Sequence, residues 1–448
     1  MSTVSLASLR RCFEGSVPAM LATCAADGTP NVAYASHVHY VDANHVALSF
    51  QFFNKTRENI LANPQATVYV THPETVAQYL LALRYLRTEE SGPVFESMRA
   101  RLAGIASHTG MAGVFRLRGS DIYEVLAIER VPGPELPLPA RPCDPLHALR
   151  AVSQRLATQT ELGGLLDALL GGLRECLGID HAMVLLADAR RQRLFTLASL
   201  GYESSGVGSE IAFGQGVIGV AAEHATPIRI NHLTQDLSYS RTMRAETLAQ
   251  APSVDLATEI PLPGLSESRS QLAVPIVIAG RVAGVLYAES AQELRFSHED
   301  EDALVALAAQ LGMAIAVMQL AENAEDGAEL PRLAGPAASP SCPPCTLRHF
   351  PHGDSVFIDD AYLIKGVAGA IFMKLVRDHL ETGRTEFSNR ELRLAPELRL
   401  PDVSDNLEAR LILLQRRLAE RGACVQIVKC GRGRFRLEVG RPLRIVPT

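Results

Sequence analysis

The chain of 448 residues carries a formal net charge of −6, and 47% of its residues are hydrophobic. This length exceeds what one ordinary core supports, so we expect two to four soluble domains, and the weak negative charge argues against a nucleic-acid-binding or membrane-coating surface over the whole molecule. Its 8 cysteines are scattered, which is typical of a reducing cytoplasm and argues against a disulfide scaffold.

Two segments of linker composition divide the chain. Residues 132–144 are too rich in proline for a helix or a central strand, and residues 322–345 are acidic at first and then rich in alanine and proline. We therefore expect three domains of ordinary size, at residues 1–131, 145–321 and 346–448.

The first domain is expected to be rich in strands. Apolar and polar residues alternate over 20–41, 45–52 and 66–73, the periodicity becomes helical over 75–103, and strands return over 113–131. A strand-rich domain with one or two helices is typical of a small antiparallel barrel.

A cationic turn lies inside this domain. Lys55-Thr56-Arg57 stands where an apolar strand passes into a short helix. The amides of a helix N-terminus attract anions, and two cations with a hydroxyl group would complete a phosphate site. The alternative is an ordinary solvated turn in which Asn54 or Thr56 caps the helix.

Residues 14–130 resemble a flavin-binding split barrel of the pyridoxamine 5'-phosphate oxidase-like superfamily. The resemblance is carried by the segments GTPNVAYAS, VALSFQFFNKTREN, NPQATVYV and FRLRGSDIYEVLAI. It implies that FMN lies between two protomers, that Lys55, Thr56 and Arg57 hold its phosphate, and that Ser49 and Gln51 approach its ring.

This sequence departs from the oxidase at one phosphate-binding position. Ala33 stands where the oxidase proper has a first phosphate-binding arginine, and its C-terminal substrate-binding Arg and His have no evident match. The resemblance therefore implies a flavin holder more readily than a vitamin-making enzyme. Deazaflavin and haem are alternative ligands, with His37, His39 and His72 as haem candidates that also have an ordinary structural interpretation.

The second domain begins with an amphipathic helix over 146–177, continues with strands and a long polar stretch, and ends with a helix capped by Ser297 and Asp300. It resembles a GAF domain, a sensory module that holds a ligand under a lid. The segments FGQGVIGVAAEHATPIRI, LAVPIVIAGRVAGVLYAES and FSHEDEDALVALAAQLGMAI carry this resemblance.

The predicted lid spans residues 232–270 and supplies the expected ligand contacts. These contacts are Asp236, Tyr239, Arg241 and Arg244. The lid has no cysteine to tether a bilin. Phe296 with Asp300 and Glu301 matches half of the cyclic-nucleotide signature of some GAF domains, but the Asn-Lys half is absent. The sequence therefore does not identify the ligand.

The third domain has strands, then helices, then a glycine-rich hairpin. Its helices are expected over 368–379, from Ser388 onward and over 404–421. This order resembles the winged helix of response-regulator effector domains, with NLEARLILLQRRLAERG as recognition helix and VKCGRGRFRLEV as wing. The sequence reads GRGRF where the bacterial family usually has Gly-Tyr.

Basic residues make this domain a candidate for DNA binding. From residue 346 onward there are 18 Lys and Arg against 13 Asp and Glu. The predicted phosphate contacts are Arg410, Arg416 and Arg417 on the long helix and Lys429, Arg432 and Arg434 on the hairpin. The alternative is a protein-binding module with a solvated basic helix face.

Cys342-Pro-Pro-Cys345 lies at the end of the second linker. A single C-x-x-C lacks the second pair of a structural zinc site, although His349 and His352 follow closely. A redox dithiol and a pair without function are the alternatives, so these cysteines are weak metal candidates.

Together these observations predict an α+β multidomain protein with a split β-barrel, a GAF sensor domain and a winged helix. We expect a cytoplasmic homodimer, with no membrane span or secretory signal, that binds FMN and a small ligand and acts through DNA. The alternative is a flavin-dependent oxidoreductase with regulatory GAF and C-terminal parts, and no catalytic residue is assigned.

Overall fold

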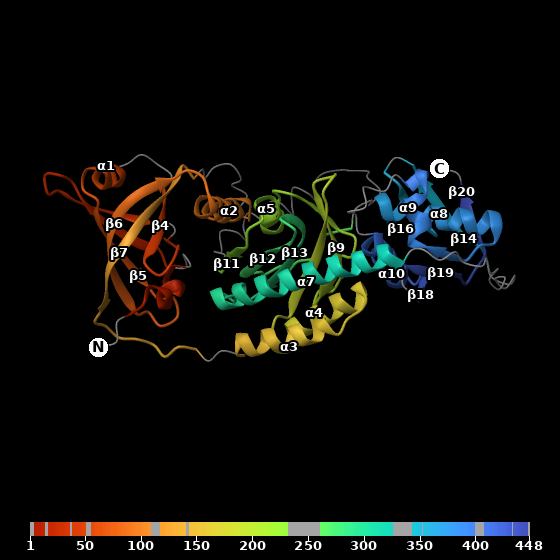
Figure 1. The fold of residues 1–448 in the computed structure, drawn as a ribbon, viewed down its shortest axis with the longest axis horizontal. Coiled ribbons are helices and arrows are strands. Elements are labelled where there is room, and N and C mark those ends of the chain that lie inside the picture. Colours follow the sequence, from red (N-terminus) through yellow and green to blue (C-terminus); the bar gives the residue numbers. More distant parts are fainter. Residues whose placement is uncertain are drawn as a thin grey trace.

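The computed structural model of the chain places three domains in succession along its longest axis (Figure 1). They follow the sequence order, with the N-terminal domain at one end and the C-terminal domain at the other. The central domain lies between them and contacts both. The structure describes residues 4–13, 17–35, 38–50, 55–108, 117–139, 143–231, 260–325, 343–351, 353–398, 407–431 and 433–446.

The N-terminal domain is a curled, half-barrel sheet. Its neighbouring strands are antiparallel, in the order β2-β1-β5-β6-β7-β4-β3. The strands are β1 (Ala19–Cys24), β2 (Pro30–Ala35), β3 (Val38–Tyr40), β4 (His45–Phe50), β5 (Gln65–Thr71), β6 (Gln78–Glu89) and β7 (Gly119–Val131). Three short helical segments accompany them: the 3-10 helix η1 (Leu6–Phe13), α1 (Lys55–Ala62) and α2 (Pro93–His108).

The predicted helical segment over 75–103 is wrong in its first half. The structure has β6 there and begins α2 only at Pro93. Leucines spaced three or four apart suggested a helix, but β6 pairs on both sides with β5 and β7 and buries Leu81 and Leu83 completely. A short apolar run fits either structure, and here the two neighbouring strands decide.

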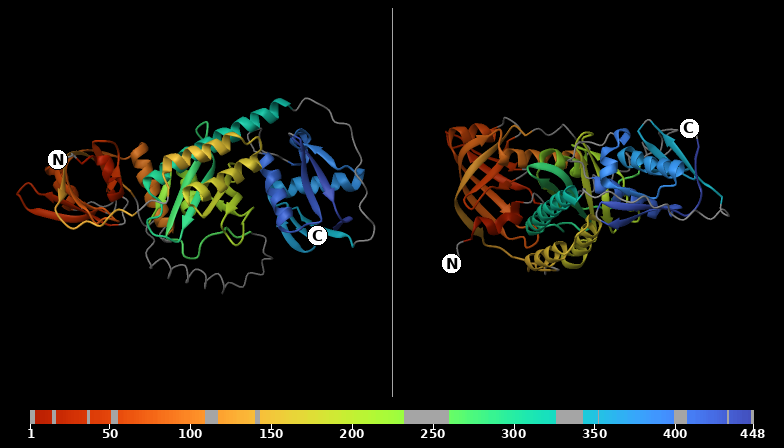
Figure 2. Two further views of the ribbon diagram at one scale, coloured as in Figure 1. Left: turned by 90° about the horizontal axis from the view of Figure 1, so that it is seen from below. Right: turned by 45° about the vertical axis from the view of Figure 1, so that its right-hand side comes forward.

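The central domain is a six-stranded antiparallel sheet in the order β10-β9-β8-β13-β12-β11. The strands are β8 (His181–Asp188), β9 (Arg193–Leu200), β10 (Glu210–Ala212), β11 (Ile228–Ile230), β12 (Ser270–Ile278) and β13 (Arg281–Ser290). The helices are α3 (Pro145–Ala157), α4 (Leu162–Leu177), α5 (Gly216–His224) and α7 (His298–Glu325). Helices α3, α4 and α7 cover one face of the sheet and α5 covers the other (Figure 2).

Local chemistry explains where these helices begin and end. The Asp144 carboxylate accepts the amides of Leu146 and His147, which starts α3. The single helix predicted over 146–177 is in fact two, α3 and α4. The predicted cap of α7 is confirmed, because the Ser297 hydroxyl accepts the Asp300 amide at 3.2 Å and the Asp300 carboxylate accepts the Ser297 amide at 2.8 Å.

The predicted absence of any segment apolar enough to cross a membrane is corrected at helix α7. By length and composition its segment His298–Ala321 is apolar enough to cross a membrane, with 39% of the most apolar window buried inside the protein. Leu304, Leu307 and Leu311 of this helix are completely buried against the central sheet. The core helix of a soluble domain passes the same test, so this apolar segment is weak evidence for a span.

The C-terminal domain combines two small sheets with three α-helices. One sheet has the order β16-β15-β14-β20, and the other has the order β17-β19-β18. Their strands are β14 (Cys345–Phe350), β15 (Ser355–Ile358), β16 (Ala361–Ile364), β17 (Glu386–Ser388), β18 (Val425–Gly431), β19 (Arg434–Val439) and β20 (Leu443–Val446). The helical segments are α8 (Gly366–Thr382), α9 (Asn389–Leu394), the 3-10 turn η2 (Pro396–Leu398) and α10 (Leu407–Glu420).

Candidate functional site

The cationic turn of the N-terminal domain begins helix α1, as predicted. Lys55 is exposed and lies 3.6 Å from the Glu58 carboxylate. Thr56 is buried, and its hydroxyl accepts a hydrogen bond from the Asn31 side chain at 2.9 Å. Of the predicted phosphate-holding residues, Lys55 therefore faces solvent, whereas Thr56 is turned toward β2.

Arg57 is held inside the half-barrel by a buried network. Its guanidinium donates to the Asp121 carboxylate at 2.5 Å and to the Thr88 hydroxyl at 2.8 Å, and it lies over the ring of Tyr85. The Thr88 hydroxyl also donates to Asp121 at 2.6 Å. Burial raises the pKa of Asp121 above its usual range even beside this arginine. Nothing in the local sequence pointed to Asp121 as a partner.

A flavin phosphate fits this turn only in part. Lys55 and the first amides of α1 offer charge and donors to an anion. The guanidinium of Arg57 already binds Asp121 and Thr88, so a phosphate would compete with these partners for its N–H donors. Ser49 lies on β4 directly opposite Ser120 of β7 in the sheet. Gln51 lies outside the described residues.

The histidines named for haem do not gather at one place among the described residues. The imidazole of His72 accepts the amides of Glu74 and Thr75 at 3.2 Å and so shapes a turn. His39 lies near Arg101 and Glu301, where the N-terminal and central domains meet. His37 lies outside the described residues.

The face of the central sheet under α5 carries a row of polar residues. His181 of β8, Glu289 of β13 and Gln271 of β12 are cross-strand neighbours in register. Glu289 is almost completely buried, and its carboxylate accepts the Leu265 amide at 3.0 Å. Gln271 donates to the Ser268 hydroxyl at 3.2 Å. This row was not predicted from the sequence, although Gln271 and Glu289 interrupt otherwise apolar strands.

Two tyrosines complete this polar row. The Tyr287 hydroxyl donates to Glu289 at 3.4 Å. The hydroxyl of Tyr202 is buried, and its ring meets the His181 ring edge to face with 5.5 Å between the centroids. Burial, together with the charge of Glu289, raises the pKa of Tyr202 well above its usual range. A buried carboxylate with two phenols favours a ligand group that carries N–H donors.

The predicted lid contacts Asp236, Tyr239, Arg241 and Arg244 lie outside the described residues. The partial cyclic-nucleotide signature is described, and it has structural partners. The Phe296 carbonyl accepts the Asn231 amide group at 2.5 Å, and Glu301 pairs with Arg229 at 2.7 Å. Nearby arginines hold the pKa of Glu301 below its usual range despite its burial. These residues fix β11 to the start of α7.

Helix α10 packs against the central domain through Arg410. The Arg410 guanidinium donates to the Asp188 carboxylate at 2.9 Å, and both side chains are buried. It also lies over the Phe195 ring, 4.1 Å from the centroid. An arginine that binds a buried carboxylate and packs over an aromatic ring of another domain holds the two domains together strongly.

The other predicted DNA contacts are also engaged where they are described. Arg416 donates to Asp167 of α4 at 2.7 Å, and Arg417 pairs with Glu420 at 3.0 Å. Lys429 lies 2.8 Å from Glu408 and 3.4 Å from Glu161. Arg434 begins β19. Arg432 lies outside the described residues.

These contacts leave only a small part of helix α10 exposed to solvent. Within the helix, the exposed positions are Gln415, Ala419 and Glu420. Leu413 and Arg417 lie next to Gly208. The φ of +88° at Gly208 is a backbone conformation that favours glycine. A solvated basic face, which both interpretations of the sequence assumed, is therefore absent from the described helix in this arrangement.

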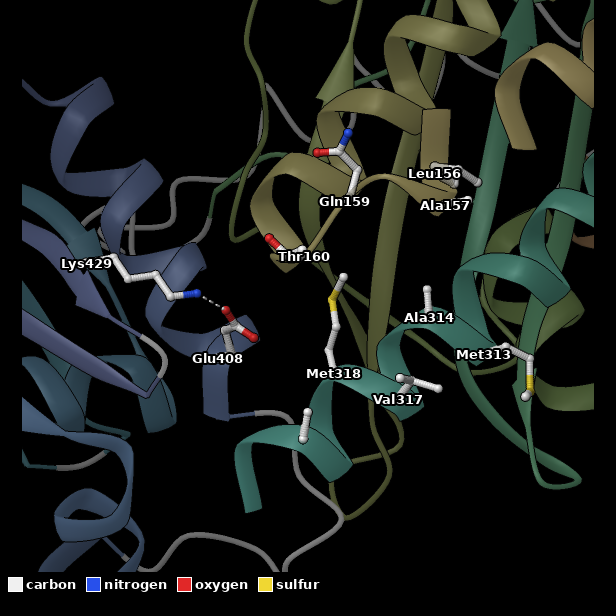
Figure 3. Close-up of a pocket in the computed structure, with 11 residues that line it drawn as sticks. Leu156, Ala157, Gln159, Thr160, Met313, Ala314, Val317, Met318, Glu408 and Lys429 are labelled. Atoms are coloured by element: carbon white, nitrogen blue, oxygen red, sulfur yellow. Dashed lines mark hydrogen bonds and ion pairs between the residues drawn. The ribbon is translucent and has the colours of Figure 1, made fainter. Parts of the chain in front are cut away.

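A cavity of about 350 Å³ separates the end of α7 from the hairpin of the C-terminal domain (Figure 3). Met313, Val317 and Met318 of α7 form one wall, and the Lys429–Glu408 pair lies across from them. On the other side of this cavity α10 packs against the central domain, and Lys365, just before α8, also pairs with Glu210 of β10 at 3.5 Å.

Cys345 begins β14 and is completely buried. Its C-x-x-C partner Cys342 lies outside the described residues. His349 pairs with Asp354 at 3.1 Å. Within the part of the chain that the structure describes, no group of three or more His, Cys, Asp or Glu residues is arranged to hold a metal.

Two family models match this chain. The model of the GAF domain matches residues 159–316, and the model of pyridoxamine 5'-phosphate oxidase matches residues 6–118. The central domain is therefore a GAF domain, and the N-terminal domain is of the pyridoxamine 5'-phosphate oxidase type. Neither match reaches the C-terminal domain.

Solved structures resemble the first two domains separately. The GAF domain from Acinetobacter phosphoenolpyruvate-protein phosphotransferase is 25% identical, over 41% of this chain and 97% of that chain, with a TM-score of 0.31. Free methionine-R-sulfoxide reductase from Neisseria meningitidis is 22% identical, over 41% and 99%, with a TM-score of 0.31.

An FMN-binding protein from Syntrophomonas wolfei is 14% identical, over 28% of this chain and 86% of that chain, with a TM-score of 0.24. Because these TM-scores are low, we draw no functional argument from the likenesses. The curated proteins contain no match to the chain.

Proposed function

We propose that this chain is a regulatory protein in which the GAF domain covers the basic helix α10 and releases it when the GAF ligand state changes. The observation that carries this proposal is the buried pair of Arg410 with Asp188, at 2.9 Å across the two domains. The released helix would act on DNA as the recognition helix of a winged-helix domain.

The element order of the C-terminal domain supports the winged-helix part of the proposal. Helix α8 is followed by β17, α9 and α10, and the hairpin of β18 and β19 pairs with β17 to make a three-stranded sheet. In a winged helix the recognition helix precedes such a hairpin and lies in the major groove. Helix α10 occupies that position in the chain.

The central domain neutralises the cations that DNA would neutralise. Asp188, Asp167 and Glu161 place carboxylates against Arg410, Arg416 and Lys429. Phosphates would compete for the same guanidinium and ammonium groups. The docked and DNA-bound arrangements of α10 are therefore mutually exclusive, which gives the GAF domain a means of control.

Two strands connect the polar row of the GAF sheet to this contact. β8 carries His181 at its start and Asp188 at its end. β9 carries Phe195 beside Arg410, and the chain reaches Tyr202 two residues after its end. A ligand that pulls on His181, Glu289 or Tyr202 would strain the strands that hold α10. The chemistry of this row favours a ligand with an ammonium, amide or guanidinium group.

The N-terminal domain is proposed to hold FMN, as its family type implies. Lys55 and the first amides of α1 would hold the phosphate, and Ser49 would lie beside the ring. A bound flavin supplies electron transfer in one- or two-electron steps. Lys55→Ala is the informative variant because this side chain is exposed and its loss leaves the Arg57 network intact. Loss of the flavin absorbance near 450 nm on this change would support the site.

A second copy of the chain is the proposed partner of helix α7. Met313, Val317 and Leu320 have spacings of four and three residues, and their exposed fractions are 63%, 59% and 69%. This seam matches the pattern of a helix that packs against another helix. Val317→Glu should reduce the mass measured by light scattering from that of a dimer to that of a monomer.

DNA binding by the full chain tests the central proposal. Asp188→Asn together with Asp167→Asn should weaken the cover over α10 and raise affinity for duplex DNA by roughly tenfold, with a steep salt dependence. Glu175→Gln, an exposed acid on the same helix as Asp167, is the control. Absence of DNA binding by every form at low salt would exclude DNA as the target.

A further inference from the structure

Two cysteines that are far apart in the sequence meet inside the C-terminal domain. Cys345 is the first residue of β14, and Cys424 lies in the turn between α10 and β18. Their thiols are neighbours, close enough for each to shift the pKa of the other. Cys345 is completely buried, whereas Cys424 is partly exposed. Neither takes part in a disulfide in this structure.

Backbone hydrogen bonds on both sides hold this pair in place. The Cys345 amide donates to the Pro442 carbonyl at 2.8 Å, and the Gly440 amide donates to the Cys424 carbonyl at 2.7 Å. β14 and β20 pair in parallel from Cys345 onward. These bonds place both cysteines beside the same short segment, Gly440 to Pro442, which links β19 of one sheet to β20 of the other.

A charged pair lies beside the two thiols. Arg441 donates to the Asp359 carboxylate at 2.5 Å, and its charge lies near the Cys424 thiol. The neighbouring Cys345 thiol and the charge of Arg441 lower the pKa of Cys424 to about 7, against the effect of its burial. The contact with Cys424 and burial raise the pKa of Cys345 well above its usual range. Of the two thiols, the more exposed Cys424 therefore forms a thiolate more readily.

We propose that Cys345 and Cys424 form an oxidation site at which hydrogen peroxide or an organic hydroperoxide produces an intramolecular disulfide. The Cys424 thiolate attacks a peroxide oxygen and the O–O bond breaks, which gives a sulfenic acid and, after proton uptake, water or an alcohol. The Cys345 thiol then attacks the Cys424 sulfur, the S–O bond breaks, and a second water molecule leaves. The two sulfur atoms lose two electrons in total, and the peroxide gains them.

This site differs from the C-x-x-C of the linker. The buried thiol of Cys345 is directed to Cys424, so the disulfide would join β14 to the turn that follows α10. Its test measures neither flavin nor DNA binding. Its failure would therefore leave the proposed function untouched.

Mass spectrometry of the full chain tests the site. Reduced protein is treated with one equivalent of hydrogen peroxide at pH 7, free thiols are blocked with N-ethylmaleimide, and the protein is digested without reduction. We expect a Cys345–Cys424 disulfide peptide as the main product. In Cys345→Ser, dimedone should label Cys424 as a sulfenic acid, and in Cys424→Ser both the disulfide and the dimedone label should disappear.

Two controls separate this chemistry from general thiol oxidation. Cys430→Ser removes an exposed thiol from the nearby strand β18 and should leave the disulfide yield unchanged. Arg441→Gln should slow disulfide formation several-fold at pH 7 and move the midpoint of Cys424 alkylation to higher pH, whereas Arg444→Gln should do neither. A Cys342–Cys345 disulfide as the main product, or no disulfide after excess peroxide, would overturn the proposal.

Discussion

Arg57 and Arg410 were both predicted to bind phosphate, and the structure places both in the same kind of setting. Each guanidinium pairs with a buried aspartate and lies over an aromatic ring, Asp121 and Tyr85 in one case and Asp188 and Phe195 in the other. The difference lies in where the partner comes from. Arg57 pairs within its own domain, whereas Arg410 pairs across two domains.

This difference predicts different consequences when each pair breaks. Inside one domain, a buried aspartate without its arginine stays buried, because the fold cannot move it to water. Between two domains, separation exposes both charges to solvent, so the cost is limited by the free energy of docking. An arginine, an aspartate and an aromatic ring thus form a structural contact inside the N-terminal domain and a releasable contact between the central and C-terminal domains.

The largest effect should come from Arg57→Ala. Removal of one member of a buried pair typically costs about 3–5 kcal/mol of unfolding free energy, because the other charge stays desolvated. Chemical denaturation monitored by circular dichroism would measure this loss in the transition of the N-terminal domain. Lys55→Ala, two residues away and exposed, is the matched control and should change little. Equal effects of the two changes would contradict the comparison.

Acid should weaken the contact between the N-terminal and central domains. Burial, with Arg101 and Arg10 nearby and Glu301 opposing them, lowers the pKa of His39 to about 4. Burial likewise lowers the pKa of His298 to about 4, among Glu299, Arg10, Arg229 and Asp302. Unfolded histidine has a pKa near 6.5, so the unfolded or separated form binds more protons between these values.

Stability should therefore be complete above about pH 6.5 and decrease as the pH falls toward 4, by on the order of 3 kcal/mol for His39. Denaturation midpoints between pH 4 and pH 7 would measure the loss. His39→Gln should flatten part of the profile, while His147→Gln, at an exposed position of α3, should not. A profile that is flat over this range in the unmodified chain would show that neither histidine is held neutral.

Arg410→Ala should cost less than Arg57→Ala, about 1–3 kcal/mol of docking free energy, and should separate the C-terminal domain without unfolding it. Small-angle scattering would show a larger maximum dimension with unchanged secondary structure. Arg421→Ala, an exposed arginine just after α10, should leave the dimension unchanged. Loss of secondary structure in Arg410→Ala would mean that this pair is as structural as Arg57.

The smallest effect should come from Asp167→Asn. Asp167 is 70% exposed, so its pair with Arg416 is a surface ion pair that contributes below about 1 kcal/mol. Titration of docking against salt in the Asp167→Asn and Asp188→Asn variants would separate the two pairs. The Asp188 contact should persist in high salt because it is buried, and the Asp167 contact should not.

Local sequence signals predicted much of this fold. The cap at Ser297, the start of α1 at Lys55, the hairpin of β12 and β13 and the alternation of β4 and β5 are short-range patterns, and the structure has all of them. The helix predicted over β6 failed because its structure depends on strands that pair with it from elsewhere in the chain.

The partners of the charged residues could not be predicted in this way. Arg410 and Asp188 lie in different domains, and a charge pattern on one helix does not reveal which carboxylate covers it. The C-x-x-C motif drew attention to Cys345 for a local reason, but the thiol that contacts it, Cys424, follows another helix far along the chain. Distant pairings of this kind need the tertiary structure.

Strand β8 connects the polar row of the GAF sheet to the contact with helix α10. It spans His181 to Asp188, about 23 Å at the usual rise per residue, with hydrogen bonds to β9 on one side and β13 on the other. A strand fixed on both sides cannot slide alone, so a force applied at His181 can reach Asp188 only if the sheet twists or tilts as a unit. The response at the far end would then be a collective movement, in which Asp188 shifts together with the neighbouring strands β9 and β13.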